Sequence, residues 1–171
     1  IKTQHMKKVI SLILGLLIVS VTYSQKINKE LTSCKMKTLD GKVVDLKDQV
    51  KSGQVTVIVF WATWCAPCKK ELVNIDELYE DWKDDYGIEV IAISIDNSRN
   101  ATKVKPYING KGWEFPVLID VNSNSKALFN YPTVPFSALI DKNKRIVYTH
   151  NGYVEGDEYN LEKHIKELVG K

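Results

Sequence analysis

The chain has 171 residues, of which 44% are hydrophobic and 26% charged, and these values fit one globular domain preceded by a leader. The formal net charge of +3 arises before Gln25, where Lys2, Lys7 and Lys8 are the only charged residues, because the 21 basic residues that follow equal the 21 acidic ones. This balance, and the lack of a basic stripe with interleaved aromatic residues, exclude nucleic acid and an anionic membrane surface as expected partners.

The start of the chain has the pattern of an export signal. Residues 9–21 are almost wholly apolar, and the small residues within 22–24 suit cleavage after that segment. We therefore expect residues 1–24 to comprise a few upstream residues and a signal peptide. Residues 25–33 are expected to be a short linker, and residues 34–171 a single domain.

Two alternatives remain for this region. The apolar run could stay as an uncleaved membrane anchor, although it is shorter than the ~20 residues of a spanning helix. Leu31-Thr32-Ser33-Cys34 also has the form of a bacterial lipobox, in which Cys34 would be a lipidated N-terminus, but a polar segment separates it from the apolar run. Otherwise Cys34 is expected in the first strand of the domain as a small apolar residue.

The first elements of the domain can be predicted from alternation and periodicity. Two short alternating segments within 34–45 flank Asp40-Gly41, a dipeptide typical of hairpin turns. Residues 55–61 are a β-branched and aromatic run that predicts a strand covered on both faces. A core-facing helix is then predicted from about Pro67 to Tyr86, with Gly87 as its stop. Its apolar positions recur at three- and four-residue steps, at Leu72, Ile75, Tyr79, Trp82 and Tyr86.

Cys65 and Cys68 lie where the buried strand becomes a helix, and this position favours redox chemistry. Cysteine reacts as the thiolate, and the free N–H groups and the dipole of a helix N-terminus lower the pKa of a thiol. Cys65 is therefore the expected nucleophile and Cys68 the expected resolving thiol. Pro67 suits the first helical turn, where its missing N–H loses no partner.

Half of a structural zinc site is the alternative reading of the two cysteines. Only Cys34, His150 and His164 could complete such a site beyond the leader, and their spacings match no common zinc motif. His150 and His164 have no partner pattern, so each is expected to be solvated or to cap an element.

The remaining segments alternate between strand and helix patterns. Residues 88–95 are an apolar strand, and strand, helix, strand in this order implies a parallel pair with a right-handed crossover. Further predicted elements are a helix over 97–112 that Pro106 weakens, a strand over 113–120, a helix over 122–130, strands over 136–140 and 145–149, and a helix over 157–169. The expected apolar stripe of the last helix is Tyr159, Leu161, Ile165, Leu168 and Val169.

The string FWATWCAPCKKE resembles the active-site strand and helix of the thioredoxin superfamily, and in particular its extracytoplasmic TlpA/ResA/CcmG-like branch. The resemblance implies an α/β thioredoxin-like fold, a central mixed sheet flanked by helices, with an N-terminal hairpin and a mid-fold insertion. It also implies a periplasmic or otherwise extracytoplasmic bacterial protein that needs no dissociable cofactor and no metal.

The same resemblance assigns roles to residues around the cysteines. In the family a cis-proline precedes the strand that here begins at Phe136, which assigns that role to Pro135, with Pro132 as the rival. The backbone of Val134 would then pair with an extended substrate peptide. Trp64, Ala66 and Pro67 would complete the substrate-binding surface, as Trp64 would contribute to an exposed apolar rim. Relatives often carry Thr at the position of Val134.

The proton donor differs from that of thioredoxin proper. Thioredoxin keeps a buried aspartate six residues before its first cysteine, where this chain has Val59. Glu71 instead matches a glutamate that ResA-like reductases hold near their cysteines, and a partly desolvated carboxylate there could move the proton of Cys68. The alternative is an exposed glutamate favoured by the helix dipole.

The expected function is exchange of disulfides with other proteins through Cys65 and Cys68, as an exported reductase. The resemblance implies a membrane thiol reductase as electron donor, and apocytochromes or mispaired secreted proteins as targets. An oxidase with the same residues is one alternative, and a Cu(I)-carrying module that uses the cysteines as soft ligands is another. Peroxidase chemistry is not expected, because no Pro and Thr arrangement of the peroxiredoxin kind precedes Cys65.

Overall fold

A computed structural model describes residues 27–171 of the chain, so the expected signal segment lies outside the described residues. Eight strands form one mixed sheet in the order β1-β8-β7-β4-β5-β6-β2-β3. Their bounds are β1 Lys29–Glu30, β2 Lys35–Thr38, β3 Val43–Asp45, β4 Thr56–Trp61, β5 Glu89–Ser94, β6 Val117–Ile119, β7 Phe136–Ile140 and β8 Arg145–Asn151. The mixed sheet and its N-terminal hairpin of β2 and β3 confirm the predicted architecture.

Strand β4 lies at the centre of the sheet. All six of its residues are buried, as its unbroken run of β-branched and aromatic residues predicted. It pairs parallel with β5 and antiparallel with β7, and the two pairings place Phe60 opposite Ile93 and Phe136. The residues that follow the carboxyl end of β4 are therefore positioned by three paired strands, β4, β5 and β7.

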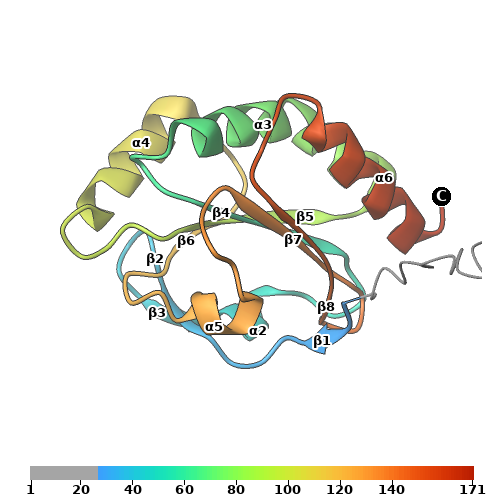
Figure 1. Ribbon diagram of the computed structural model, residues 1–171, viewed down its shortest axis with the longest axis horizontal. Coiled ribbons are helices and arrows are strands. Elements are labelled where there is room, and N and C mark those ends of the chain that lie inside the picture. The colour runs from blue at the N-terminus through green and yellow to red at the C-terminus, as the bar shows by residue number, and fades with distance from the viewer. Residues whose placement is uncertain (1–26) are drawn as a thin grey trace, which may run out of the picture.

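Helices cover both faces of the sheet. Figure 1 shows α3, α4 and α6 along one side and the short α2 and α5 on the other. The helices are α2 Leu46–Gln49, α3 Ala66–Tyr86, α4 Val104–Lys111, α5 Ser125–Phe129 and α6 Asp157–Val169, with a 3-10 turn, η1, at Ala101–Lys103. Helix α3 ends at Gly87, whose φ of 65° places it in the left-handed region that favours glycine at a helix C-terminus.

Three expectations about the elements need correction. Residues 29–31, expected within a linker, belong to the domain, because β1 pairs with β8 and Leu31 is fully buried. The helix expected over 97–112 begins only at Val104, after η1, since Asn97 caps a separate turn through the N–H groups of Arg99 and Asn100. Tyr159 is 61% exposed and does not belong to the apolar stripe of α6, whose buried residues are Glu158, Leu161 and Ile165.

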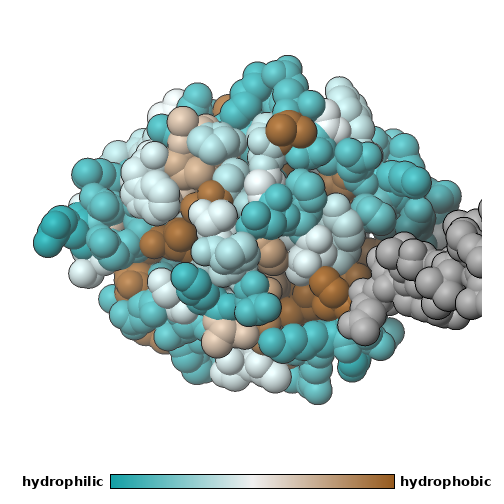
Figure 2. Space-filling model, in the orientation of Figure 1, coloured by the Kyte–Doolittle hydropathy of each residue, from teal (hydrophilic) through white to brown (hydrophobic). Residues whose placement is uncertain are grey.

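The surface offers scattered apolar residues. The face drawn in Figure 2 is mostly hydrophilic, with hydrophobic residues in several separate spots. Among residues 27–171 no helix combines the length and the apolar character needed to cross a bilayer. Within the described part of the chain, the exposed large hydrophobic residues are Ile27, Val43, Trp64, Val154 and Tyr159, and Trp64 is the one next to the cysteine pair in sequence.

Candidate active site

Cys65 and Cys68 form a disulfide at the N-terminus of α3. Cys65 is the N-cap residue of this 21-residue helix, and its Sγ accepts the backbone N–H of Cys68 at 3.3 Å. The two Cα atoms are 5.4 Å apart, within the usual range for a disulfide. Cys65 keeps 5% of its surface exposed, whereas Cys68 is fully buried. Cys65 is thus the less deeply buried member of the pair.

The turn that carries Cys65 is attached to the end of β5 through a buried aspartate. Asp96 is fully buried and accepts hydrogen bonds from the backbone N–H of Thr63 at 2.8 Å and from its Oγ1 at 2.7 Å. Ser94 donates a further bond to the same carboxylate. Asp96, just after the end of β5, therefore holds the turn through two hydrogen bonds to Thr63, which lies two residues before Cys65.

The loop before β7 contains the cis peptide bond, between Val134 and Pro135, and not at Pro132. Because Phe136 pairs with Phe60, Pro135 lies at the end of the sheet from which the chain leaves β4 for the cysteines. The carbonyl oxygen of Pro135 accepts the N–H of Gly152 at 2.8 Å. Val134 is buried, and its carbonyl oxygen accepts a hydrogen bond from the Thr133 hydroxyl at 3.3 Å.

The aromatic residues on either side of the turn have opposite environments. Trp64 is 61% exposed, and Ala66 and Pro67 beside it are also exposed. Trp61 is fully buried, and its ring packs against those of Tyr107 and Trp113. The expected substrate-binding residues around the cysteines are thus open to partners, while Trp61 anchors the turn to the core.

Glu71 is buried one helical turn after Cys68. The carboxyl group is 3% exposed, and its Oε1 accepts a hydrogen bond from Ser137 while Oε2 is buried without a partner. Burial raises the pKa of Glu71 to about 7, the Ser137 bond opposes that rise, and the charges of Asp157 and Glu158 add to it. The exposed alternative for Glu71 is therefore wrong, and the group can hold or release a proton near neutral pH.

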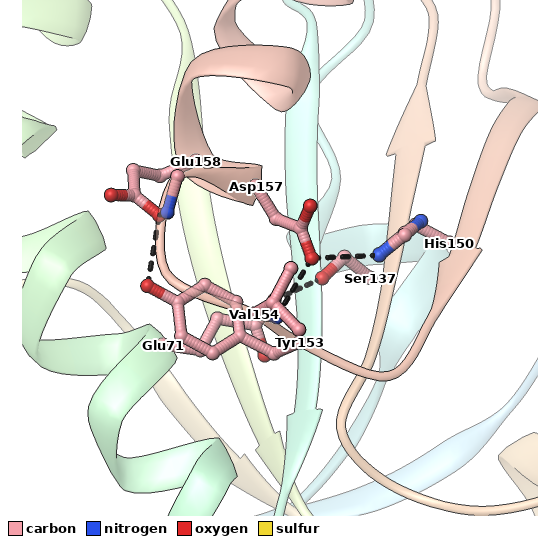
Figure 3. A network of polar contacts seen from close by, with 8 residues as sticks. Glu71, Ser137, His150, Tyr153, Val154, Asp157 and Glu158 are labelled. Carbon is pink, nitrogen blue, oxygen red and sulfur yellow. Dashed lines mark hydrogen bonds and ion pairs between the residues drawn. The ribbon is translucent and has the colours of Figure 1, made fainter.

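A polar cluster that the sequence patterns did not predict lies around Glu71. His150 of β8 contacts Asp157 at the start of α6, with 3.2 Å between Nε2 and Oδ2 (Figure 3). The Tyr153 hydroxyl donates to Glu158 at 2.8 Å. His150 thus has a specific partner, although no sequence spacing pointed to one, because the contact joins a strand to a helix across a loop.

The third cysteine lies apart from the pair. Cys34 is buried with a free thiol just before β2, and burial raises its pKa to about 11. Among the described residues, no group of three or more histidine, cysteine or acidic side chains is arranged to hold a metal ion. Leu31 is part of the core and β1 pairs with β8, and both precede Cys34, so cleavage at the lipobox would remove structural residues.

Comparisons with known proteins agree with this geometry. Residues 27–149 match the family model described as the AhpC/TSA family. The thiol-disulfide oxidoreductase ResA of Bacillus thuringiensis (strain Al Hakam) is 35% identical over 84% of this chain and 79% of its own length. An uncharacterized thioredoxin-like protein from Porphyromonas gingivalis is 42% identical with a TM-score of 0.73, covering 84% of this chain and 95% of that one. A protein of Chlorobium tepidum provisionally assigned as the thiol:disulfide interchange protein DsbE is 26% identical with a TM-score of 0.74, covering 86% and 100%.

Proposed function

The chain belongs to the AhpC/TSA family and is a thioredoxin-like thiol-disulfide oxidoreductase of the ResA type, and from this premise we propose that it is an exported reductase of protein disulfides. The observation that carries the proposal is the disulfide at the N-terminus of α3, with Cys65 as the N-cap residue and the buried carboxyl group of Glu71 one helical turn after Cys68. Cys65 is the nucleophile, Cys68 the resolving thiol, and Glu71 the group that takes the proton of Cys68.

The reaction proceeds in two exchanges. In the reduced protein the thiolate of Cys65 attacks a substrate disulfide, so that a mixed disulfide forms and the first substrate sulfur leaves as a thiolate. Glu71 then accepts the proton of Cys68, and the resulting thiolate attacks the Sγ of Cys65. The Cys65–Cys68 disulfide forms and the second substrate thiolate leaves. Two electrons have passed to the substrate, whose two thiolates take protons from solvent.

The acidic surroundings favour reduction of substrates over their oxidation. Strong oxidants of this chemistry owe their high potential to a stabilised thiolate in the reduced form. Here a carboxyl group follows Cys68 by one helical turn, and Asp157 and Glu158 lie near that carboxyl group. An ionised Glu71 would oppose a thiolate on Cys68, one helical turn away, which would favour the disulfide form and lower the potential.

The substrate is proposed to lie along the loop that ends at Pro135. The backbone of Val134 would pair with an extended segment of the partner, because the cis proline that follows it adds no competing donor. Trp64, Ala66 and Pro67 would form the exposed rim against which apolar parts of the partner pack. A contact made through the backbone depends little on the side chains of the partner, so it suits substrates of many different sequences.

The cellular setting is also part of the proposal. The apolar segment at 9–21 supports export, with the signal either cleaved or kept as a membrane tether. Outside the cytoplasm the protein would receive two electrons per cycle from a membrane thiol reductase. Apocytochromes and mispaired secreted proteins are the proposed targets, since both need cysteine thiols restored in an oxidising compartment.

The test is to trap the mixed disulfide. With Cys68→Ser, Cys65 should accumulate covalent adducts with protein disulfides such as those of insulin, because nothing resolves them. Cys65→Ser should form no adduct, and Cys34→Ser, a buried thiol apart from the pair, should reduce insulin at the parental rate. The assignment of the nucleophile would be overturned if Cys65→Ser formed adducts through Cys68 while Cys68→Ser formed none.

A further inference from the structure

Glu71 shares a small cavity with side chains from four different elements. The polar residues that line it are Glu71 of α3, Ser137 of β7, Tyr148 and His150 of β8, and Asp157 and Glu158 of α6. Its volume is close to the minimum that accommodates one water molecule. The buried carboxyl group of Glu71 therefore faces a polar chamber, although the helix that carries it packs against an apolar core.

A series of neighbouring side chains leads from Glu71 to the surface. Ser137 donates to Oε1 of Glu71, and Ser137 is the cross-strand partner of His150, so that the two side chains share one face of the sheet. His150 in turn contacts Asp157 at 3.2 Å. The side chain of His150 is 39% exposed and that of Asp157 18%, so the series begins at a buried acid and ends in solvent.

We propose that His150 is a positioning residue for the thiol chemistry, which together with Asp157 controls the proton affinity of Glu71 and connects its proton to solvent. This inference rests on the proposed role of Glu71 as the group that takes the proton of Cys68. The proton leaves Cys68 for Glu71 and passes through the cavity to the His150–Asp157 pair and then to water. No electrons move in this part of the cycle.

The sign of the control follows from the charges around the cavity. Asp157 is a negative charge that disfavours the ionised form of Glu71, and a protonated His150 offsets it. The other titratable groups that line the cavity are Tyr148 and Glu158. Burial raises the pKa of Tyr148, and the carboxylate of Glu158 accepts hydrogen bonds from the Tyr153 hydroxyl and from the N–H of Gly156. Among the described residues that line the cavity, His150 is the one whose side chain can carry a positive charge.

The experiment compares the titration of Glu71 in three variants of the oxidised protein. The probe is the chemical shift of the side-chain carboxyl carbon in glutamate labelled with carbon-13, and Glu71→Gln identifies the signal by its loss. His150→Gln should raise the pKa of Glu71 by about 0.5 or more, because Asp157 then lacks its cationic partner. Asp157→Asn should lower it by a similar amount. Both substitutions remove the same contact, so a purely structural role would not give shifts of opposite sign.

His164→Gln is the matched control. His164 lies on α6 with its side chain 38% exposed and a glutamate partner, Glu167, at 3.4 Å, but it does not line the cavity. The His164→Gln substitution should leave the midpoint of the Glu71 titration at its parental value. An unchanged midpoint in both His150→Gln and Asp157→Asn, or equal shifts in one direction, would overturn the proposal.

The failure of this inference can be told apart from that of the proposed function. Single-turnover resolution of the mixed disulfide should be at least tenfold slower in Glu71→Gln if Glu71 accepts the proton of Cys68. If that rate is unchanged while His150→Gln and Asp157→Asn shift the titration as expected, the role of Glu71 fails and the control by His150 stands. If the rate falls but the titration does not move, only the inference about His150 fails.

Discussion

The hydroxyl group of Ser137 on β7 donates a hydrogen bond to Oε1 of Glu71 on α3, so the acidic side chain is fixed by the sheet and not by solvent. Strand β7 continues directly from Pro135, whose peptide bond is cis. The start of this strand thus holds the proposed proton acceptor through Ser137 and follows directly on the proposed substrate loop. A shift of β7 would disturb both at once.

Burial of Glu71 should make the protein less stable as the pH rises. Its pKa is about 7 in the folded chain against an ordinary value of 4.5, so between these values the folded state binds the proton more tightly than the unfolded state. Stability is therefore lost as the pH rises from 4.5 to 7, by on the order of 3 kcal/mol. Urea unfolding at pH 5 and pH 8 should show this loss in the parental protein and not in Glu71→Gln. An equal loss in both proteins would assign the pH dependence to other groups.

Thr63→Val tests the attachment of the cysteine turn to β5. The substitution keeps the shape of the side chain but removes the hydroxyl donor to buried Asp96, and a hydrogen bond to a charged group is worth about 1.5–3 kcal/mol. We expect a loss of this size in urea unfolding and slower reduction of insulin, since the turn before Cys65 is less fixed. Thr102→Val, at an exposed threonine of η1, is the control and should change neither value. Parental stability of Thr63→Val would show that the backbone N–H bond suffices.

Asp45 should stabilise the hairpin region only above its titration range. Its carboxylate accepts bonds from Ser33, from the N–H of Cys34 and from the N–H of Lys47, and these bonds hold its pKa well below 3.8. The contribution is therefore present above about pH 4 and is lost as the pH falls further. Asp45→Asn should be less stable than the parent at pH 7, and exposed Asp48→Asn, within the helix α2 that Asp45 caps, should not. Equal unfolding midpoints for the two variants at pH 7 would contradict this account.

Cys34 should be inert in the folded protein. Burial raises its pKa to about 11, so little thiolate exists at neutral pH, and the thiol lies away from the helix N-terminus that favours the thiolate of Cys65. In the reduced protein at pH 7, iodoacetamide should modify Cys65 first and leave Cys34 unmodified until urea unfolds the chain. Mass spectrometry of the alkylated peptides measures both. Modification of Cys34 at the rate of Cys65 would show that the segment around β2 opens in solution.

The strands and helices nearest the cysteines could be predicted well because their signals are local. The β-branched run predicted β4, the apolar steps from Leu72 to Trp82 predicted α3, and Gly87 marked its end. Strand β1 could not be predicted, since two residues in a polar segment carry no alternation and are held only by pairing with β8. The exposure of Tyr159 was also missed, because Glu158 takes the buried position on α6 that an apolar residue was expected to fill.

The candidate site was predictable in part for the same reason. Cys65, Cys68 and Glu71 lie at the N-cap and within the first two turns of one helix, so their spacing in sequence gives their spacing in space. The contacts of Thr63 with Asp96 and of His150 with Asp157 join separate elements. Such contacts depend on how the strands are ordered and on which face each residue occupies, and a single sequence gives neither.

The reduction potential of the Cys65–Cys68 couple tests the proposed function most directly. It should be measured by equilibration with a thiol buffer at pH 7 in the protein with Cys34→Ser, so that only one redox couple is present. The acidic surroundings of the pair predict a value near or below about −250 mV, in the range of thioredoxin-like reductases. A value near about −120 mV, as for strong disulfide oxidants, would contradict the proposed direction of electron flow.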